Sequence, residues 1–130
     1  MGRSKIFLVD DDPVFIKILH HSFEAKKVKG VVDFSSGEEC LANLNKRPAL
    51  VLLDFSMKGL NGLDVLRQIK KQTPKTNVII LTGLEDTEVK QKCLEEGASE
   101  YIVKNETGLD HLRENIIPQY KSTGLFSLFN

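Results

Sequence analysis

Carboxylate side chains follow two apolar runs of the sequence, at the point where each run ends. The acidic triplet Asp10–Asp12 comes directly after Ile6–Val9, and Asp54 follows Leu50–Leu53. If both runs are strands of one parallel sheet, their carboxyl ends meet at the same edge. Carboxylates gathered there repel one another and raise at least one pKa, unless a divalent cation or a buried lysine compensates. Asp11 and Asp54 are suited to bind a hard ion such as Mg²⁺, with water filling the remaining positions.

Two further polar groups end other apolar runs: Thr82, which precedes Gly83, and Lys104. Each of these residues has an ordinary interpretation when taken alone. Asp12 is explained by helix capping, a threonine after a strand is usually a turn residue, and a lysine is usually solvated. Their conjunction at one predicted sheet edge, where open α/β folds bind ligands, indicates a functional site.

Five short apolar runs must position these residues, and they alternate with amphipathic segments. Three of the runs are continuously apolar, which is typical of parallel strands covered on both faces. The predicted strands are Ile6–Val9, Gly30–Phe34, Leu50–Leu53, Val78–Leu81 and Tyr101–Val103.

Each intervening segment carries a helix-capping signal. Gly97 is predicted to stop the fourth helix, and Pro118 to end or kink the fifth because its ring excludes the preceding turn's carbonyl. Strict alternation of strands and helices predicts right-handed crossovers and an α/β doubly wound parallel sheet. The predicted caps are Asp12 ahead of Pro13, Ser36 in a capping box with Glu39, Asn61 ahead of Gly62, Asp86, and Thr107.

Composition narrows the function classes. The 130 residues suit one domain, and 41% hydrophobic and 28% charged residues exclude collagen-like, disordered and membrane proteins. Eighteen basic residues balance eighteen acidic ones, which gives no electrostatic footprint for nucleic acid or an anionic membrane. Cys40 and Cys93 lack metal-site spacing and are interpreted as reduced thiols. With no signal peptide or membrane span in the sequence, we expect a soluble, cytoplasmic domain.

The spaced motifs resemble the receiver domain of two-component response regulators. The resemblance rests on Leu8–Asp12, Asp54, Thr82-Gly83 and Lys104, and it covers roughly residues 5–121. It implies a flavodoxin-like (βα)₅ three-layer sandwich with strand order 2-1-3-4-5. Residues 1–121 would form the receiver domain. Residues 122–130, which include four apolar residues, would be a C-terminal tail or truncated linker, either unstructured or docked on this domain or a partner.

The resemblance also implies roles for individual residues. Asp54 would be the phosphoacceptor, and Mg²⁺ would be held by the acidic pair Asp10 and Asp11, by Asp54, and by the backbone carbonyl of Ser56. Lys104 and the hydroxyl of Thr82 would contact oxygens of the phosphoryl group. Phosphoryl transfer needs this positioning and charge neutralisation more than covalent help from the protein.

By the same resemblance, Thr82 and Tyr101 match the family's switch positions, and Gly62 matches the glycine that starts the third helix. Tyr101 alone would be an ordinary half-buried strand aromatic. The phosphoryl donor would be a phosphohistidine on a sensor histidine kinase or a phosphotransfer protein, and the output a downstream protein target or output domain. The chain would be a signalling phosphoacceptor rather than an enzyme. Homodimers through helix four, strand five and helix five are common in the family.

Two residues, Asn105 and Lys58, depart from the family pattern. Asn105 follows Lys104 where receivers usually have a cis proline, so we predict a trans or strained bond and a less rigidly held Lys104. Lys58 stands where proline is common, either as a cation that aids anion binding or as a solvated side chain. The positions said to tune phosphoryl lifetime hold Ser56 and Leu84, and Leu84 cannot orient an attacking water, which predicts slow self-dephosphorylation.

The sequence leaves three alternative functions open. A haloacid-dehalogenase-like phosphatase would use Asp10 and Asp12 with Thr82 and Lys104, but it lacks a later acidic pair and leaves Asp54 without a role. A pseudo-receiver would keep the fold and bind proteins without taking phosphate. A nucleotide-binding flavodoxin-like protein is disfavoured because the first strand–helix turn is acidic and would repel phosphate. The three histidines fall outside the predicted strand ends and are interpreted as surface or helix residues: His20, His21 and His111.

Overall fold

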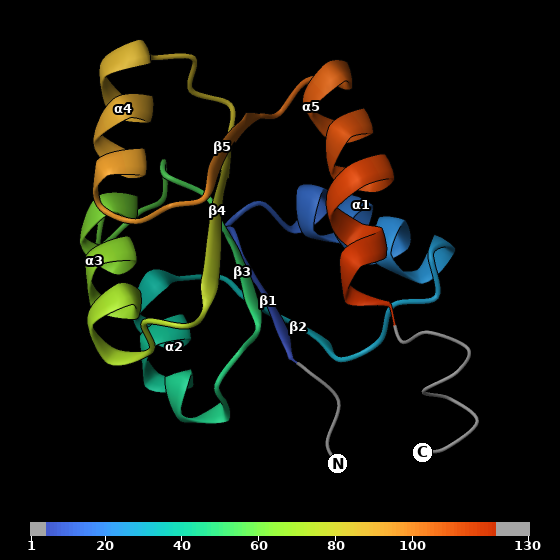
Figure 1. Ribbon diagram of the computed structural model, residues 1–130, viewed down its shortest axis with the longest axis horizontal. Helices are drawn as coiled ribbons and strands as arrows, with labels where there is room; N and C mark the ends of the chain where they lie inside the picture. The colour runs from blue at the N-terminus through green and yellow to red at the C-terminus, as the bar shows by residue number, and fades with distance from the viewer. Residues whose placement is uncertain (1–4, 122–130) are drawn as a thin grey trace.

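A five-stranded parallel sheet forms the middle layer of the computed structural model, which describes residues 5–121 (Figure 1). The strand order is β2-β1-β3-β4-β5, so the first two crossovers run in opposite directions along the sheet. The doubly wound fold and its strand order are therefore confirmed, and each strand is within a residue of its predicted bounds. The strands are β1 (Ile6–Val9), β2 (Val31–Phe34), β3 (Leu50–Leu53), β4 (Asn77–Thr82) and β5 (Glu100–Val103).

Helices cover both faces of the sheet, with α2, α3 and α4 on one side and α1 and α5 on the other (Figure 1). None of the helices in the described part of the chain has the length and apolar character needed to cross a bilayer. The expectation for residues 122–130 lies outside the described residues. The helices are α1 (Pro13–Ala25), α2 (Gly37–Ala42), η1 (Leu44–Lys46), α3 (Gly62–Gln72), α4 (Thr87–Glu95), α5 (Glu106–His111), η2 (Leu112–Ile116) and η3 (Ile117–Tyr120).

The two helical layers are held by two separate apolar clusters. Alternate side chains of a strand point to opposite faces, so Ile6 and Leu8 of β1 join the cluster under α1 and α5, whereas Phe7 and Val9 join the one under α2, α3 and α4. All four are essentially inaccessible to solvent. Cys40 and Cys93 are free, buried thiols of the second cluster, and burial raises the pKa of Cys40 to about 12. Burial on both faces explains why the central strands are continuously apolar.

Four of the five predicted helix caps are confirmed. The side chains of Asp12, Ser36, Asn61 and Asp86 each accept a hydrogen bond from a backbone N–H in the first turn of the following helix. Gly97 follows α4 with a φ of 110°, a conformation that glycine adopts at no steric cost, as predicted for a helix stop.

The predicted cap of the fifth helix is wrong. Thr107 lies inside α5, and Asn105 is the cap: its side-chain oxygen accepts the N–H of Gly108 at 2.7 Å. The backbone of Asn105 is extended, with φ −139° and ψ 178°, as is usual for a capping residue. Asparagine therefore starts this helix two residues earlier than the threonine would.

The C-terminal part of the fifth helical segment changes its hydrogen-bonding pattern instead of stopping. After α5, the chain forms a π-type turn, η2, and then the 3₁₀ turn η3, which includes Pro118. Proline has no N–H to donate to the carbonyl four residues earlier. Pro118 is predicted to end or kink this helix, but the α-helical hydrogen bonding already ends at His111, and the chain remains helical past the proline to Tyr120.

Glycine at position 108 is predicted to be required for α5 to lie against β5. A Cβ there would overlap the carbonyl oxygen of Val103 and press on the side chain of Ile102. We expect Gly108→Ala to lower the free energy of unfolding by about 1–3 kcal/mol, as overpacking does. Urea denaturation measures the change. Gly83→Ala is the matched control, because a Cβ at Gly83 meets nothing within 4 Å; equal stability of the two variants would contradict the prediction.

Candidate functional site

Three aspartates converge at the carboxyl edge of β1 and β3. The parallel register pairs Val9 with Leu53, and the N–H of Asp54 donates to the carbonyl of Val9 at 3.0 Å. Asp10 and Asp54 are therefore neighbours, and both are buried, at 4% and 6% exposure. Asp11 is exposed beside them, and one carboxylate oxygen from each residue lies within 4.8 Å of the others. The sequence prediction that these carboxylates gather at one edge is confirmed.

Lys104 supplies the positive charge that the buried carboxylates need. Its Nζ atom, which approaches from the end of β5, lies 2.7 Å from Asp10 Oδ2 and 3.1 Å from Asp54 Oδ2. The same atom sits 4.3 Å above the ring centre of Phe15, on α1, in a cation–π contact. Burial lowers the pKa of Lys104, but the hydrogen bonds to Asp10 and Asp54 outweigh it and raise the pKa overall. The lysine is thus held as a cation.

The charge at the site is not fully balanced, since one ammonium faces three carboxylates. Burial raises the pKa of Asp10, and its hydrogen bonds from Lys104 and from the backbone N–H of Asp12 only partly offset that rise. Asp11 is contacted by the backbone N–H of Lys58 at 3.4 Å, while the side chain of Lys58 is exposed. An additional cation would therefore be attracted to this edge.

The loop after β3 turns tightly behind Asp54. The N–H of Ser56 donates to Asp54 Oδ1 at 3.0 Å, which fixes the orientation of that carboxylate. Gly62 begins α3, as predicted, and its N–H donates to the carbonyl of Phe55 at 3.2 Å. A Cβ at Gly62 would lie 2.6 Å from the Cα of Phe55. Only glycine lets α3 start this close to the residue that follows Asp54. The backbone carbonyl of Ser56 as a metal ligand stays a prediction.

Thr82 ends β4 at the same edge and is completely buried. Its hydroxyl accepts the N–H of Leu84 at 3.4 Å, and its carbonyl accepts the N–H of Lys104 at 2.8 Å. The second bond joins the ends of β4 and β5, so the threonine and the lysine are positioned together.

Tyr101 is tied to the loop that follows Thr82. Its hydroxyl donates to the carbonyl of Leu84 at 2.6 Å, and the ring is half-buried. Burial raises the pKa of Tyr101 to about 12, so the phenol remains a proton donor at neutral pH. Leu84 itself is 36% exposed. Through its N–H and its carbonyl, this one residue is hydrogen-bonded to both Thr82 and Tyr101.

The bond between Lys104 and Asn105 is trans, since residues 5–121 contain no cis peptide bond. The trans alternative of the sequence prediction is therefore confirmed, and Lys104 reaches both carboxylates across it. Whether the lysine is less rigidly held stays a prediction. His20 and His21 lie in α1 and His111 ends α5, in agreement with their interpretation as helix residues.

Two contributions to the site were missed by the sequence analysis. Phe15 is not among the predicted site residues, yet its ring supports Lys104. The bridging role of Leu84 uses backbone groups, which no residue type reveals. The position of Phe15, one turn after the acidic triplet, could have suggested the cation–π contact. The hydrogen bonds of the Leu84 backbone left no signal in the sequence.

The comparison with protein families agrees with this geometry. The family model for the response regulator receiver domain matches residues 6–117. The chain therefore belongs to the response regulator receiver family.

Curated relatives are about one-third identical to this chain over the residues that align. The DNA-binding transcriptional regulator NtrC of Salmonella typhimurium is 33% identical over 105 residues, which are 80% of this chain and 22% of NtrC. The response regulator protein VraR of Staphylococcus aureus is 33% identical over 109 residues, or 82% of this chain and 52% of VraR. The chain thus spans between about a fifth and a half of the length of these relatives.

Solved structures share the fold. The BeF₃-activated receiver domain of DrrB, a response regulator of Thermotoga maritima, has a TM-score of 0.75 and 32% identity, covering 85% of this chain and 92% of that one. The phosphorylated cyanobacterial phytochrome response regulator RcpA has a TM-score of 0.78 and 26% identity, covering 91% of each chain.

Because the carboxylates outnumber the compensating lysine, neutralising the exposed one is predicted to help folding. We expect Asp11→Asn to raise the thermal midpoint slightly without metal, on the order of 1–3 °C, since it removes like-charge repulsion. Added Mg²⁺ should then stabilise the native sequence but not the variant, because a ligand that binds only the folded state raises its stability. Thermal unfolding with and without Mg²⁺ measures both effects.

The matched control is Asp12→Asn, which changes the neighbouring residue of the same acidic triplet. Asparagine caps a helix as well as aspartate does, and Asp12 is not part of the carboxylate cluster. This control should keep the Mg²⁺ response. A full Mg²⁺ response in Asp11→Asn would show that Asp11 is not a ligand.

Proposed function

We propose that this chain is a phosphorylation-controlled switch of a two-component system, in which Asp54 receives a phosphoryl group from a phosphohistidine. The donor would be a sensor histidine kinase or a phosphotransfer protein. The observation that carries the proposal is the contact of Lys104 with two buried aspartates from neighbouring strands. Membership of the receiver family supports it, as does the similar regulator RcpA, whose solved structure is of the phosphorylated form.

The surroundings of Asp54 suit a nucleophile. One carboxylate oxygen accepts the N–H of Ser56 and the other accepts from Lys104, so both oxygens of the group are held in place. In the proposed transfer, an Asp54 oxygen bonds to phosphorus while the bond from phosphorus to the histidine nitrogen breaks, and the nitrogen keeps the electron pair. Lys104 then pairs with a phosphoryl oxygen. The Thr82 hydroxyl donates to another phosphoryl oxygen. Both contacts compensate negative charge in the buried site.

The residues at this edge fit a hard divalent cation. Three carboxylate oxygens lie within reach of one another at this edge, which also lacks positive charge. Mg²⁺ prefers such oxygen ligands. Asp10, Asp11, Asp54 and the backbone carbonyl of Ser56 would hold the ion. Bound there, Mg²⁺ would neutralise charge on the phosphoryl oxygens during transfer.

We further propose that Leu84 transmits the change from Thr82 to Tyr101. The hydrogen bond from the Leu84 N–H to the Thr82 hydroxyl is long, at 3.4 Å, and therefore weak. A phosphoryl group adds nearly two negative charges and new acceptors beside Thr82. If the hydroxyl turns to donate to it, the loop at Leu84 shifts and the Tyr101 hydrogen bond to the Leu84 carbonyl breaks. Coupling of about 1–3 kcal/mol is the usual scale for such switches.

The remaining proposals concern the context of the domain. The switched surface, formed by α4, β5 and α5, would contact a downstream protein or an output domain, and it would serve as the interface of a homodimer. The chain matches only part of NtrC and VraR. Neither relative therefore shows what output this protein has. We expect a cytoplasmic location, no direct contact with nucleic acid or membrane, and slow self-dephosphorylation, since Leu84 carries no polar group to orient water.

The first prediction of this function is acceptor-specific phosphorylation. Incubation with acetyl phosphate and Mg²⁺ should add one phosphoryl mass to the native chain, and none to Asp54→Asn, because an amide is not a nucleophile of this kind. Intact-mass spectrometry measures the gain. Asp12→Asn, the matched control, should be phosphorylated like the native chain, and omission of Mg²⁺ should abolish the gain.

Other outcomes would select among the alternatives. No mass gain in the native chain would favour the pseudo-receiver, which binds proteins without being phosphorylated. A gain that persists in Asp54→Asn would point to another nucleophile, with Asp10 the first to test. Steady turnover of a generic phosphomonoester would favour the haloacid-dehalogenase-like phosphatase.

A second prediction tests the switch through Tyr101. Beryllium fluoride with Mg²⁺, as a phosphoryl mimic, should change the near-ultraviolet circular dichroism of Tyr101, because its hydrogen bond to Leu84 is lost. Thr82→Ala should bind the mimic yet show a much smaller change. The other tyrosine, Tyr120, accepts a hydrogen bond from Asn77 at the far end of β4 and should contribute a constant signal. Tyr101→Phe should abolish the change, and an unaltered change in Thr82→Ala would refute the coupling.

A further inference from the structure

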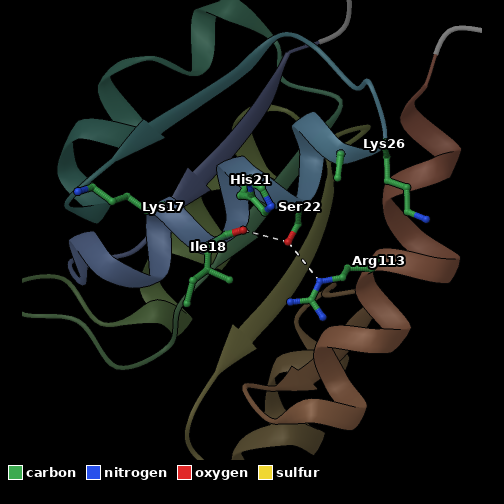
Figure 2. A pocket seen from close by; sticks show the side chains of 7 residues that line it. Lys17, Ile18, His21, Ser22, Lys26 and Arg113 are labelled. Carbon is green, nitrogen blue, oxygen red and sulfur yellow. Dashed lines mark hydrogen bonds between the residues drawn. The ribbon is translucent and has the colours of Figure 1, made fainter.

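A groove on the α1–α5 side of the molecule is not used by the phosphorylation site. It lies between the outer face of α1 and Arg113 of η2 and has a volume of about 490 Å³ (Figure 2). The buried hydroxyl of Ser22 lies at its base, where it donates to the carbonyl of Ile18 and accepts from Arg113 Nε at 3.3 Å. This hydrogen bond fixes the two walls of the groove relative to each other.

The lining of the groove is apolar with a cationic rim. Ile18 is 38% exposed, one of the few large apolar side chains in the described part of the chain that solvent reaches this freely. Ala25 continues the apolar surface along α1, and Lys17, Lys26 and Arg113 surround it. The aliphatic stems of such cations cover apolar surface while their charged ends stay in water. Their charged ends also attract the faces of aromatic rings.

A second hollow extends the groove to the point where the described chain ends. It has a volume of about 280 Å³ and shares Ala25 and Lys26 with the first. Its other walls include Pro118 and Lys121, the last described residue. The two hollows therefore adjoin at Ala25 and Lys26, with Ile18 lining the first and Lys121 the second.

The sequence that follows Lys121 has the composition these hollows would accept. Residues 122–130 contain no charged side chain, and they include two leucines and two phenylalanines at Leu125, Phe126, Leu128 and Phe129. These residues lie four to eight positions beyond Lys121, a reach of about 13–26 Å for an extended chain. The stretch of α1 from Ala25 back to Lys17 is about 12 Å long. The tail is long enough to reach the groove and lie along it.

We propose that residues 125–129 dock in the groove between α1 and η2 of the same chain. The apolar side chains would cover Ile18 and Ala25, and the two phenylalanine rings would lie against the cations of the rim. The docked tail would cover the outer face of α1, the same helix whose Phe15 supports Lys104 from the other side. This proposal is independent of phosphorylation at Asp54.

A single tryptophan tests the docking directly, because the chain contains none. We expect Phe126→Trp to show blue-shifted emission and several-fold weaker quenching by acrylamide than the same chain in urea. Ile18→Glu in this background should move both readings towards the unfolded values, since it places a charge in the apolar part of the groove. Lys26→Glu, which removes a rim cation, should weaken docking independently.

Leu94→Glu is the matched control: Leu94 is 40% exposed, is equally apolar and lies on α4, across the sheet. It should leave the emission of Trp at position 126 unchanged, and circular dichroism should find all variants folded. Three outcomes would overturn the proposal. They are an emission like that of the unfolded chain, a blue shift that Ile18→Glu does not alter, and a shift that depends on protein concentration, which would place the tail on a second copy.

Discussion

The burial of two adjacent aspartates at the ends of β1 and β3 is the constraint on which the rest of the site depends. Two carboxylates this close are costly in a buried position unless a cation is hydrogen-bonded to both. Lys104 meets that requirement, and it can do so only because β5 ends at the same edge. Phe15 then limits where the ammonium can go. One cation is therefore placed beside the two buried aspartates by the strand order, the first turn of α1 and the end of β5.

Asn105 follows Lys104 at the position where receivers usually have proline. Asn105 is in trans linkage and caps α5, a task for which proline has no side-chain acceptor. The cap begins α5 immediately after the strand, and Gly108 allows that first turn to lie against Val103. At the position where the family pattern has proline, this chain therefore has a residue that caps α5 directly after Lys104.

The strands and the carboxylate cluster could be predicted from the sequence because both follow from short-range patterns. Continuous apolar runs mark Ile6–Val9 and Leu50–Leu53, and parallel pairing then forces Asp10 and Asp54 together. The start of α5 was not predictable in the same way, since Asn105 and Thr107 are both good caps and the structure uses the earlier one. The hydrogen bonds that the backbones of Ser56 and Leu84 make at the site escape prediction, because the directions of backbone groups depend on loop geometry.

The two hydrogen bonds of Leu84 differ in strength, and in the proposed switch the weaker one is lost first. Its carbonyl holds Tyr101 with a short hydrogen bond of 2.6 Å, whereas its N–H holds the Thr82 hydroxyl with one of 3.4 Å. A new acceptor near Thr82 therefore competes first with the weaker of the two bonds. Both bonds end on Leu84. Loss of the bond to Thr82 therefore lets the peptide groups of Leu84 rotate, including the carbonyl that accepts from Tyr101. In the proposed switch, the stronger bond at Tyr101 would then depend on a loop that the Leu84–Thr82 bond no longer holds.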